Sequence, residues 1–230
     1  MSISTPLSAS VVAGLIALDI TGIGPFMISQ PIVCGPLFGL ITGHVEAGVL
    51  AGAIIQLLWM DVTPVGVGIP YDSTAATILT VYWSGQMPDG GGLSVVPLML
   101  LLAVPSGVLF RYVDQKARRI NTYIARAVEH VSDAHLSLAL VIGTAFGVFL
   151  NWFRYALSFF IVMFLGNLFW EKVPSQFPQV WQIVVRGMGI SALLLPVAGI
   201  GVVLEYFLME EPERKWTALL RQKPSRSSVL

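Results

Sequence analysis

The first 110 residues of this chain contain no lysine or arginine, and all 13 basic residues lie at or after Arg111. Across the 230 residues only 11% are charged and the mean hydropathy is +0.78, whereas about a quarter of the residues in an average soluble domain are charged. So little polar surface cannot cover a water-soluble globule. The composition therefore predicts an integral membrane protein that is embedded in a lipid bilayer.

The basic residues gather in two short segments that flank apolar runs, residues 111–126 and the tail after Arg214. The positive-inside rule places both in the cytoplasm of a multi-pass inner-membrane protein. Acidic residues are mixed among them, so no nucleic-acid partner is expected. We predict a membrane domain over residues 1–209, with a cytoplasmic basic segment at 111–135, and a charged cytoplasmic tail over 210–230.

Residues 31–79 form an apolar stretch that is broken by polar groups. Its runs at 31–43 and 47–60 are each shorter than the ~20 residues that a helix needs to cross a bilayer. The polar junction at 43–46 suits a tight turn, so the pattern predicts a re-entrant helical hairpin, which must be covered by protein or line a cavity. The alternative is one bent span across both runs.

Glycines recur at four-residue spacing in these two runs, which places them on one face of each helix. Small residues on one face let helix backbones approach closely within a bilayer. We expect these glycines to pack the helices and so to position a site, not to form it; they are Gly35, Gly39 and Gly43, then Gly48 and Gly52.

The whole pattern predicts an all-α integral membrane protein, a polytopic helical bundle with a re-entrant hairpin and broken helices. The single cysteine, Cys34, excludes an internal disulfide and is expected to be a small buried residue. Before the hairpin we expect a span at 8–28 that contains Asp19. After it we expect an unwound stretch rich in proline and glycine at 61–72, a helix at 73–84, and a span at 95–113 followed by a polar helical segment at 114–135. A partly buried or amphipathic helix at 137–150 is then separated by Asn151–Arg154 from a crossing at 153–168, and an exterior loop at 171–178 leads to a last crossing at 180–208.

Three polar side chains in residues 31–79 are candidates for substrate binding. The amide of Gln56 both donates and accepts hydrogen bonds, so it suits sugar hydroxyls or a bond to a neighbouring helix. Asp61 could hold vicinal hydroxyls beside the ring of Trp59, or it could simply reach interfacial water. Asp72 is the third candidate, and either Asp72 or Ser73 is predicted to cap a helix whose free amides favour polar oxygens. Capping and substrate binding are compatible.

Other polar groups have structural readings beside functional ones. His44 and Glu46 are candidates for substrate or proton binding, or are solvated at the hairpin tip. Arg154 and Arg186 could pair with Asp19 or Glu205, contact lipid phosphate, or contact substrate. No nucleotide-binding, zinc-binding or nucleophile motif is present, so we expect no cofactor and no catalytic residue.

Residues 30–79, QPIVCGPLFGLITGHVEAGVLAGAIIQLLWMDVTPVGVGIPYDSTAATIL, resemble the enzyme IIC membrane component of the mannose/fructose/sorbose-type phosphotransferase system. The resemblance continues more weakly through LNWFRYAL and RGMGISALLLPVAG. Gln56 falls where the family has Gln or Glu, and Asp72 falls on its PxD position. Asp61 replaces the Gly or Asn of many members, and the C-terminus looks shorter than in longer members.

The resemblance implies a subunit that moves a hexose-like sugar across the inner membrane. It implies an enzyme IID membrane partner, with soluble IIA and IIB proteins that relay phosphate from phosphoenolpyruvate, and we expect an oligomer. The sugar would bind among Gln56, Asp61, Asp72 and Ser73, and an elevator-like movement of the re-entrant region would carry it inward. The alternatives are a scaffold or sensor that does not transport and a small-solute transporter that is independent of phosphate transfer.

Overall fold

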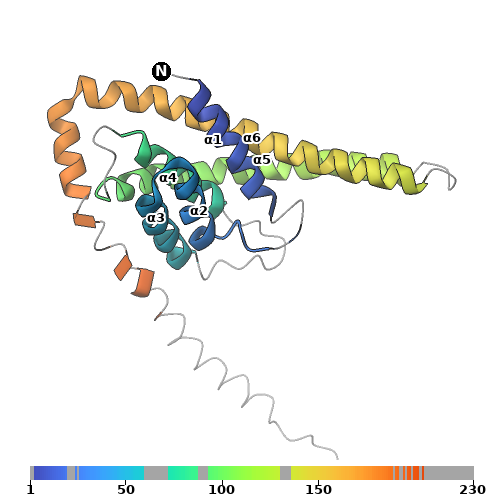
Figure 1. The fold of residues 1–230 in the computed structure, drawn as a ribbon, viewed down its shortest axis with the longest axis horizontal. Helices are drawn as coiled ribbons and strands as arrows, with labels where there is room; N and C mark the ends of the chain where they lie inside the picture. Colours follow the sequence, from blue (N-terminus) through green and yellow to red (C-terminus); the bar gives the residue numbers. More distant parts are fainter. Residues whose placement is uncertain are drawn as a thin grey trace, which may run out of the picture.

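A computed structural model describes residues 3–19, 24, 26–59, 72–87, 93–129, 136–188, 190, 191, 194, 196, 197, 199–201 and 204. All regular elements in these ranges are helical, which confirms the all-α prediction (Figure 1). The predicted boundary between membrane domain and tail at 209/210 lies outside the described residues. The helices are α1 (Ser4–Leu18), α2 (Pro31–Thr42), α3 (Val45–Leu58), α4 (Ser73–Gly85), α5 (Val96–Glu129) and α6 (Leu136–Gln176).

Helices α2 and α3 form the predicted hairpin and pack along each other (Figure 1). Proline at the first position suits the start of α2, because its missing N–H would have no partner there. Gly43 ends α2 with a φ of 82°, a left-handed conformation that favours glycine, and the His44 amide donates to the Gly39 carbonyl at 2.7 Å. The two-helix interpretation is therefore confirmed, and the single bent span is wrong.

Gly35, Gly48 and Gly52 pack against backbone across the hairpin, as predicted, whereas Gly39 faces the turn at His44 and Gly43 has no atom within 4 Å of a built Cβ. A Cβ built on Gly35 would collide with the carbonyl oxygen of Gly48, and a Cβ on Gly48 would collide with that of Gly35. A Cβ on Gly52 would likewise meet the carbonyl oxygen of Pro31. The close approach of α2 and α3 therefore depends on residues that have no side chain. Cys34 is fully buried beside Gly35, as expected.

Helix α4 is the centre of the bundle. Every residue from Thr74 to Ser84 is buried, and the helix contacts α2, α3, α5 and α6. A helix that is buried on all sides must be apolar, or have internally bonded hydroxyls, all round. Accordingly, the hydroxyls of Thr77 and Thr80 donate to the helix's own carbonyls, at 2.8 Å each.

Helix α5 joins the span predicted at 95–113 to most of the polar helical segment predicted at 114–135, whereas α6 is longer than predicted. In Figure 1 the two helices extend side by side, green and yellow, away from the body. Two helical stretches among the described residues, Val96–Tyr123 and Ser137–Lys172, have the length and composition to cross a membrane. The predicted interruption at Asn151–Arg154 is wrong, since α6 runs through it. The side chains of Asn151 and Arg154 find polar partners on α5 and α6, so the helix continues through them.

The predicted exterior loop at 171–178 is also wrong for most of its length. Helix α6 continues to Gln176, only Phe177 lies outside a helix, and a further helical segment begins at Pro178. Proline is well suited to a first helical position, and the Trp181 amide donates to the Phe177 carbonyl at 2.9 Å. Pro178 thus starts a new helix and Pro174 lies within α6, whereas we had expected both prolines to lie in a loop.

Candidate functional site

The candidate site lies where α3 ends and where α2 and α4 begin. The Gln56 side-chain oxygen accepts from the Ile32 amide at 3.5 Å, which ties α3 to the first turn of α2. The Thr74 hydroxyl donates to the Ser29 carbonyl at 2.6 Å, which ties the first turn of α4 to the residues before α2. Gln56 and Asp72 are therefore brought to the same end of the hairpin.

Asp72, one of the two residues predicted as a cap, caps α4. Its carboxylate accepts from the Ala75 amide at 2.9 Å, and its backbone is extended. The Asp72 amide donates to the Gly107 carbonyl of α5 at 3.4 Å. Ser73, beside it, accepts from the Thr77 hydroxyl through its carbonyl at 2.8 Å. The substrate-binding roles of Asp72 and Ser73 stay predictions.

Two helix N-termini open at this site, those of α2 and α4. The first turn of a helix has amides without intrahelical partners and a partial positive charge. Gln56 and Asp72 each occupy one of these amides through a side-chain oxygen. The Val33 and Cys34 amides of α2 donate to the Gln30 carbonyl, so the groups that this site offers are the Asp72 carboxylate and the N–H groups of the Gln56 side chain.

Gln56 shows the helix-to-helix bond that we had considered as its structural role. This bond leaves the two N–H donors of its amide group for other partners, so its binding role stays a prediction. Asp61 and the proline- and glycine-rich stretch lie in 60–71, outside the described residues, and their predicted roles stay predictions as well.

A polar chain that the sequence analysis missed connects three helices at the site. The Asp19 carboxylate, which is buried at the end of α1, accepts from the Phe26 amide at 2.9 Å and from the Ser29 amide and hydroxyl at 3.0 Å each. The Ser29 carbonyl in turn accepts from Thr74. The available signals were the hydroxyl residues Ser29, two positions before Pro31, and Thr74, in the first turn after Asp72. Hydroxyl residues are common at helix starts, so these two did not indicate a bond between distant helices.

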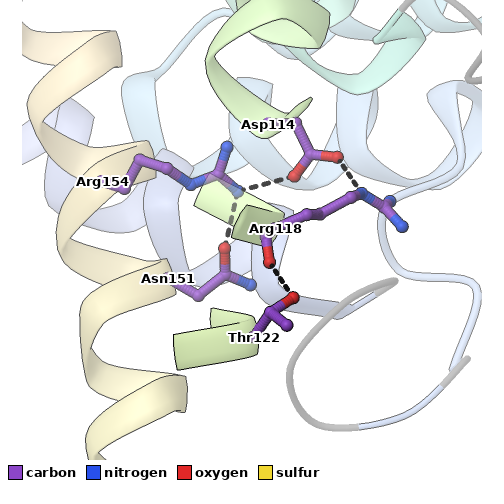
Figure 2. Close-up of polar contacts among 5 residues, drawn as sticks. All are labelled: Asp114, Arg118, Thr122, Asn151 and Arg154. Carbon is purple, nitrogen blue, oxygen red and sulfur yellow. Dashed lines mark hydrogen bonds and ion pairs between the residues drawn. The ribbon is translucent and has the colours of Figure 1, made fainter. Parts of the chain in front are cut away.

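Arg154 is bound differently from our prediction. Figure 2 shows its guanidinium between Asp114 of α5 and Asn151 of α6, with Nη2 at 3.0 Å from Asp114 Oδ1 and 2.6 Å from Asn151 Oδ1. Pairing with Asp19 is therefore wrong, because that carboxylate is filled by backbone and hydroxyl donors. Glu205, the other proposed partner, lies outside the described part of the chain.

The hairpin tip lies away from this site. The His44 ring packs on Gly85, where a Cβ would collide with it, so the tip is next to the C-terminal end of α4. Asp72 is at the opposite end of α4, a helix of 13 residues or about 20 Å. Glu46 is exposed in the first turn of α3. A substrate or proton role for His44 and Glu46 stays a prediction.

Across the described ranges, no group of three or more His, Cys, Asp or Glu side chains is placed to hold a metal ion. The arrangement offers hydrogen-bonding groups at helix ends in an apolar bundle.

Comparisons with known proteins agree on one family. The family model EII-Sor, described as "PTS system sorbose-specific iic component", matches residues 3–213. The "Putative N-acetylgalactosamine permease IIC component 2" of Escherichia coli (strain K12) is 28% identical over 115 residues, which are 49% of this chain and 84% of that protein.

Two solved structures share the fold. One, titled "Structure of membrane protein", has a TM-score of 0.65 at 17% identity and covers 95% of this chain and 85% of its own. The second is a complex of the mannose transporter ManYZ with microcin E492, with a TM-score of 0.59 at 18% identity over 97% of this chain and 87% of the other. The arrangement of helices is therefore that of known membrane proteins.

Proposed function

The chain belongs to the family of sorbose-specific IIC components of the sugar phosphotransferase system, and from this premise we propose that it moves a hexose-like sugar across the inner membrane while a partner IIB protein phosphorylates the sugar. Family membership makes it a membrane component of sugar transport. The identity of the sugar, the coupling to IIB and the multi-pass inner-membrane location belong to the proposal.

The observation that carries this proposal is the meeting of Gln56 and Asp72 at the N-termini of α2 and α4. A carboxylate has about four lone-pair sites, so Asp72 can cap α4 and still accept from hydroxyls. The two N–H groups of the Gln56 side-chain amide would supply donors for the same sugar. Asp61 would add a second carboxylate from the neighbouring stretch.

The hairpin suits a moving element. Helices α2 and α3 are shorter than a bilayer-spanning helix, so α4, α5 and α6 are proposed to cover them. An elevator-like displacement of the hairpin with the start of α4 would carry the sugar from one side of the membrane to the other. The exposed apolar side chains along α6, such as Val141, Phe149 and Leu165, support contact with lipid and with a second membrane subunit.

The proposed partners are an IID membrane subunit and soluble IIA and IIB proteins, in an oligomeric complex. The similarity to a transporter with two named subunits, ManYZ, supports the first of these. The chain itself is proposed to be a transport subunit without a catalytic residue of its own, so phosphoryl transfer is left to its partners.

The test is uptake of labelled mannose, sorbose and N-acetylgalactosamine in a host that lacks its own carriers and expresses the chain with IIA, IIB and IID. Asp72→Asn keeps the cap, because asparagine caps as well as aspartate, and is expected to reduce uptake at least ten-fold. Gln56→Ala should reduce it too, whereas Gln86→Ala, at an exposed position after α4, should not.

Each alternative has its own signature in this assay. Unchanged uptake in both Asp72→Asn and Gln56→Ala would remove the site assignment. Uptake that follows a proton gradient, and is indifferent to phosphoenolpyruvate, would favour the phosphate-independent transporter. Absence of uptake with the full set of partners would favour the scaffold or sensor.

A further inference from the structure

We propose that one exposed face of α5, beyond residue 111, is the surface on which the soluble IIB protein docks. The inference rests on the proposed function, because a IIB protein that phosphorylates the entering sugar must reach the membrane subunit. The face carries two tyrosines and three cations, which we call the basic stripe: Tyr112, Lys116, Arg119, Tyr123 and Arg126.

The residues of the basic stripe share one side of α5. They follow one another at spacings of four, three, four and three residues, which keeps them on one helix face and makes a row about 20 Å long. All five are exposed, and the two tyrosines, Tyr112 and Tyr123, are 57% and 69% exposed. A partner can therefore touch the whole row at once.

The basic stripe points away from α6. Asp114 and Phe110 are each two residues from Tyr112 and so lie on the opposite side of α5. Asp114 is buried and pairs with Arg154 of α6 (Figure 2). Phe110 is also buried, and its ring centroid is 4.6 Å from that of Phe159 in α6. The side of α5 that packs on α6 is therefore the side opposite the basic stripe.

The helix beside this part of α5 is apolar. In Figure 1 the outer half of α5 and the first half of α6 extend together from the body, and we call this pair the arm. Residues 137–150 of α6 contain no charged residue. Ile142 and Phe149 are exposed and lie about half a turn around α6 from Asn151, which binds Arg154. The apolar face of the arm is therefore the face opposite α5.

The two opposite faces of the arm decide which partner the basic stripe can meet. Exposed apolar side chains on a helix suit the acyl region of a bilayer. Two packed helices are about 20 Å thick with their side chains, whereas the headgroup layer of one leaflet is only about 5–8 Å thick. When the apolar face meets lipid, the basic stripe is held in water beyond the headgroups. This arrangement favours a soluble protein over lipid phosphate.

The chemistry of the basic stripe suits an acidic protein surface. Among the residues that the structure describes, its three cations have no carboxylate partner, whereas the neighbouring Arg118 is paired with Asp114. The Lys116 ammonium lies 5.3 Å from the centroid of the Tyr112 ring. Tyrosine and arginine are enriched among the residues that dominate binding at protein interfaces, and a row of positive charge attracts carboxylates. We expect the docking surface of IIB to carry carboxylates around an apolar patch that receives the tyrosine rings.

The plain alternative is that these cations are solvated and only determine which side of the membrane the segment occupies. Arg118 and Arg119 separate the two roles, since they are adjacent and both exposed, but only Arg119 lies on the basic stripe. A role in topology depends on the number of charges, whereas docking depends on the face that carries them.

The experiment measures the rates at which purified IIB protein binds the purified full chain in neutral detergent, where membrane topology has no effect. We expect the triple variant Lys116→Gln/Arg119→Gln/Arg126→Gln to associate at least ten-fold more slowly and to lose most of the salt dependence of association. Arg119→Gln alone should slow association several-fold. The matched control Arg118→Gln should associate at nearly the wild-type rate.

The tyrosines should act on the other rate. Tyr112→Ala/Tyr123→Ala should speed dissociation more than it slows association, because aromatic anchors hold a complex that has already formed. All the replaced side chains are exposed, so each variant should melt at nearly the wild-type temperature.

Several results would overturn the docking surface. Wild-type association in the triple variant, or equal losses in Arg118→Gln and Arg119→Gln, would do so and leave the proposed function intact, because sugar uptake is measured separately. Wild-type association together with fewer bound phosphatidylglycerol molecules, counted by native mass spectrometry, would assign the stripe to lipid headgroups instead. A wild-type chain that binds no IIB protein would refute both the docking surface and the proposed coupling to IIB.

Discussion

Replacing Gly48 by alanine tests the close packing of the α2–α3 hairpin. A Cβ on Gly48 would lie 2.8 Å from the carbonyl carbon of Gly35 and 3.2 Å from Pro36 Cα, and even closer to the Gly35 carbonyl oxygen. All three atoms belong to the backbone of α2, so no side chain can move aside. Because ordinary contact begins at about 3.4 Å, the two helices must separate by more than half an ångström.

Overpacking of this kind costs about 1–3 kcal/mol. Alanine also gains up to about 1 kcal/mol over glycine in helix propensity, so the comparison needs a glycine with free space. Gly147 on α6 has no atom within 4 Å of a built Cβ, and Gly147→Ala therefore carries the propensity gain without the clash.

The chain provides its own reporter of hairpin opening. Cys34 is the single cysteine, is fully buried, and precedes Gly35 in α2. A thiol reagent such as a maleimide should reach it only when the hairpin opens. A loss of 1–3 kcal/mol corresponds to an increase in labelling rate of roughly five- to a hundred-fold.

The assay compares maleimide labelling of Cys34 in membranes for the wild type, Gly48→Ala and Gly147→Ala. We expect fast labelling in Gly48→Ala alone. Equal rates in Gly48→Ala and Gly147→Ala would show that the hairpin accommodates a methyl group, and the argument from close backbone contact would be wrong.

Two further perturbations probe buried hydrogen bonds elsewhere in the bundle. Tyr82→Phe removes the hydroxyl that accepts from Asn167 Nδ2 at 2.7 Å and leaves a buried side-chain amide unpaired. The purified protein should therefore lose about 1–3 kcal/mol of stability. It should melt at a lower temperature than the control Tyr112→Phe, which changes an exposed position. Asp19→Ala removes the acceptor of three hydrogen bonds around Ser29; we expect a lower melting temperature and reduced sugar uptake, with part of both restored in Asp19→Asn, and an unchanged melting temperature would contradict a structural role for this chain of bonds.

Local signals predicted the hairpin and the cap of α4 well. Pro31, Gly43 and Asp72 act through the backbone of their own helix ends, so their effects can be read from neighbouring residues. The glycine spacing was equally informative, because residues four apart share a helix face whatever the helix packs against. The burial of Cys34 followed from its place in an apolar run.

Predictions that depended on distant partners were wrong. We expected Asn151–Arg154 to interrupt a helix, because residues 137–168 are too long for one simple span and these residues are polar. Asp114, 40 positions earlier, supplies the partner for Arg154, and α6 runs on. Asp19 was one of the partners considered for an arginine, but the chain folds back so that Phe26 and Ser29 satisfy its carboxylate.

The sequence alone determined the features that depend on composition and on interactions between neighbouring residues. A nearly charge-free first half demands an apolar solvent, and short apolar runs that are punctuated by glycine and proline specify helix lengths and turns. Which ends of which helices meet is a matter of packing among segments far apart in the chain. Only the folded bundle places Gln56 and Asp72 at one end of the hairpin, and only there do Asp114 and Arg154 pair across α5 and α6, since each charge needs a partner that no local pattern can reveal.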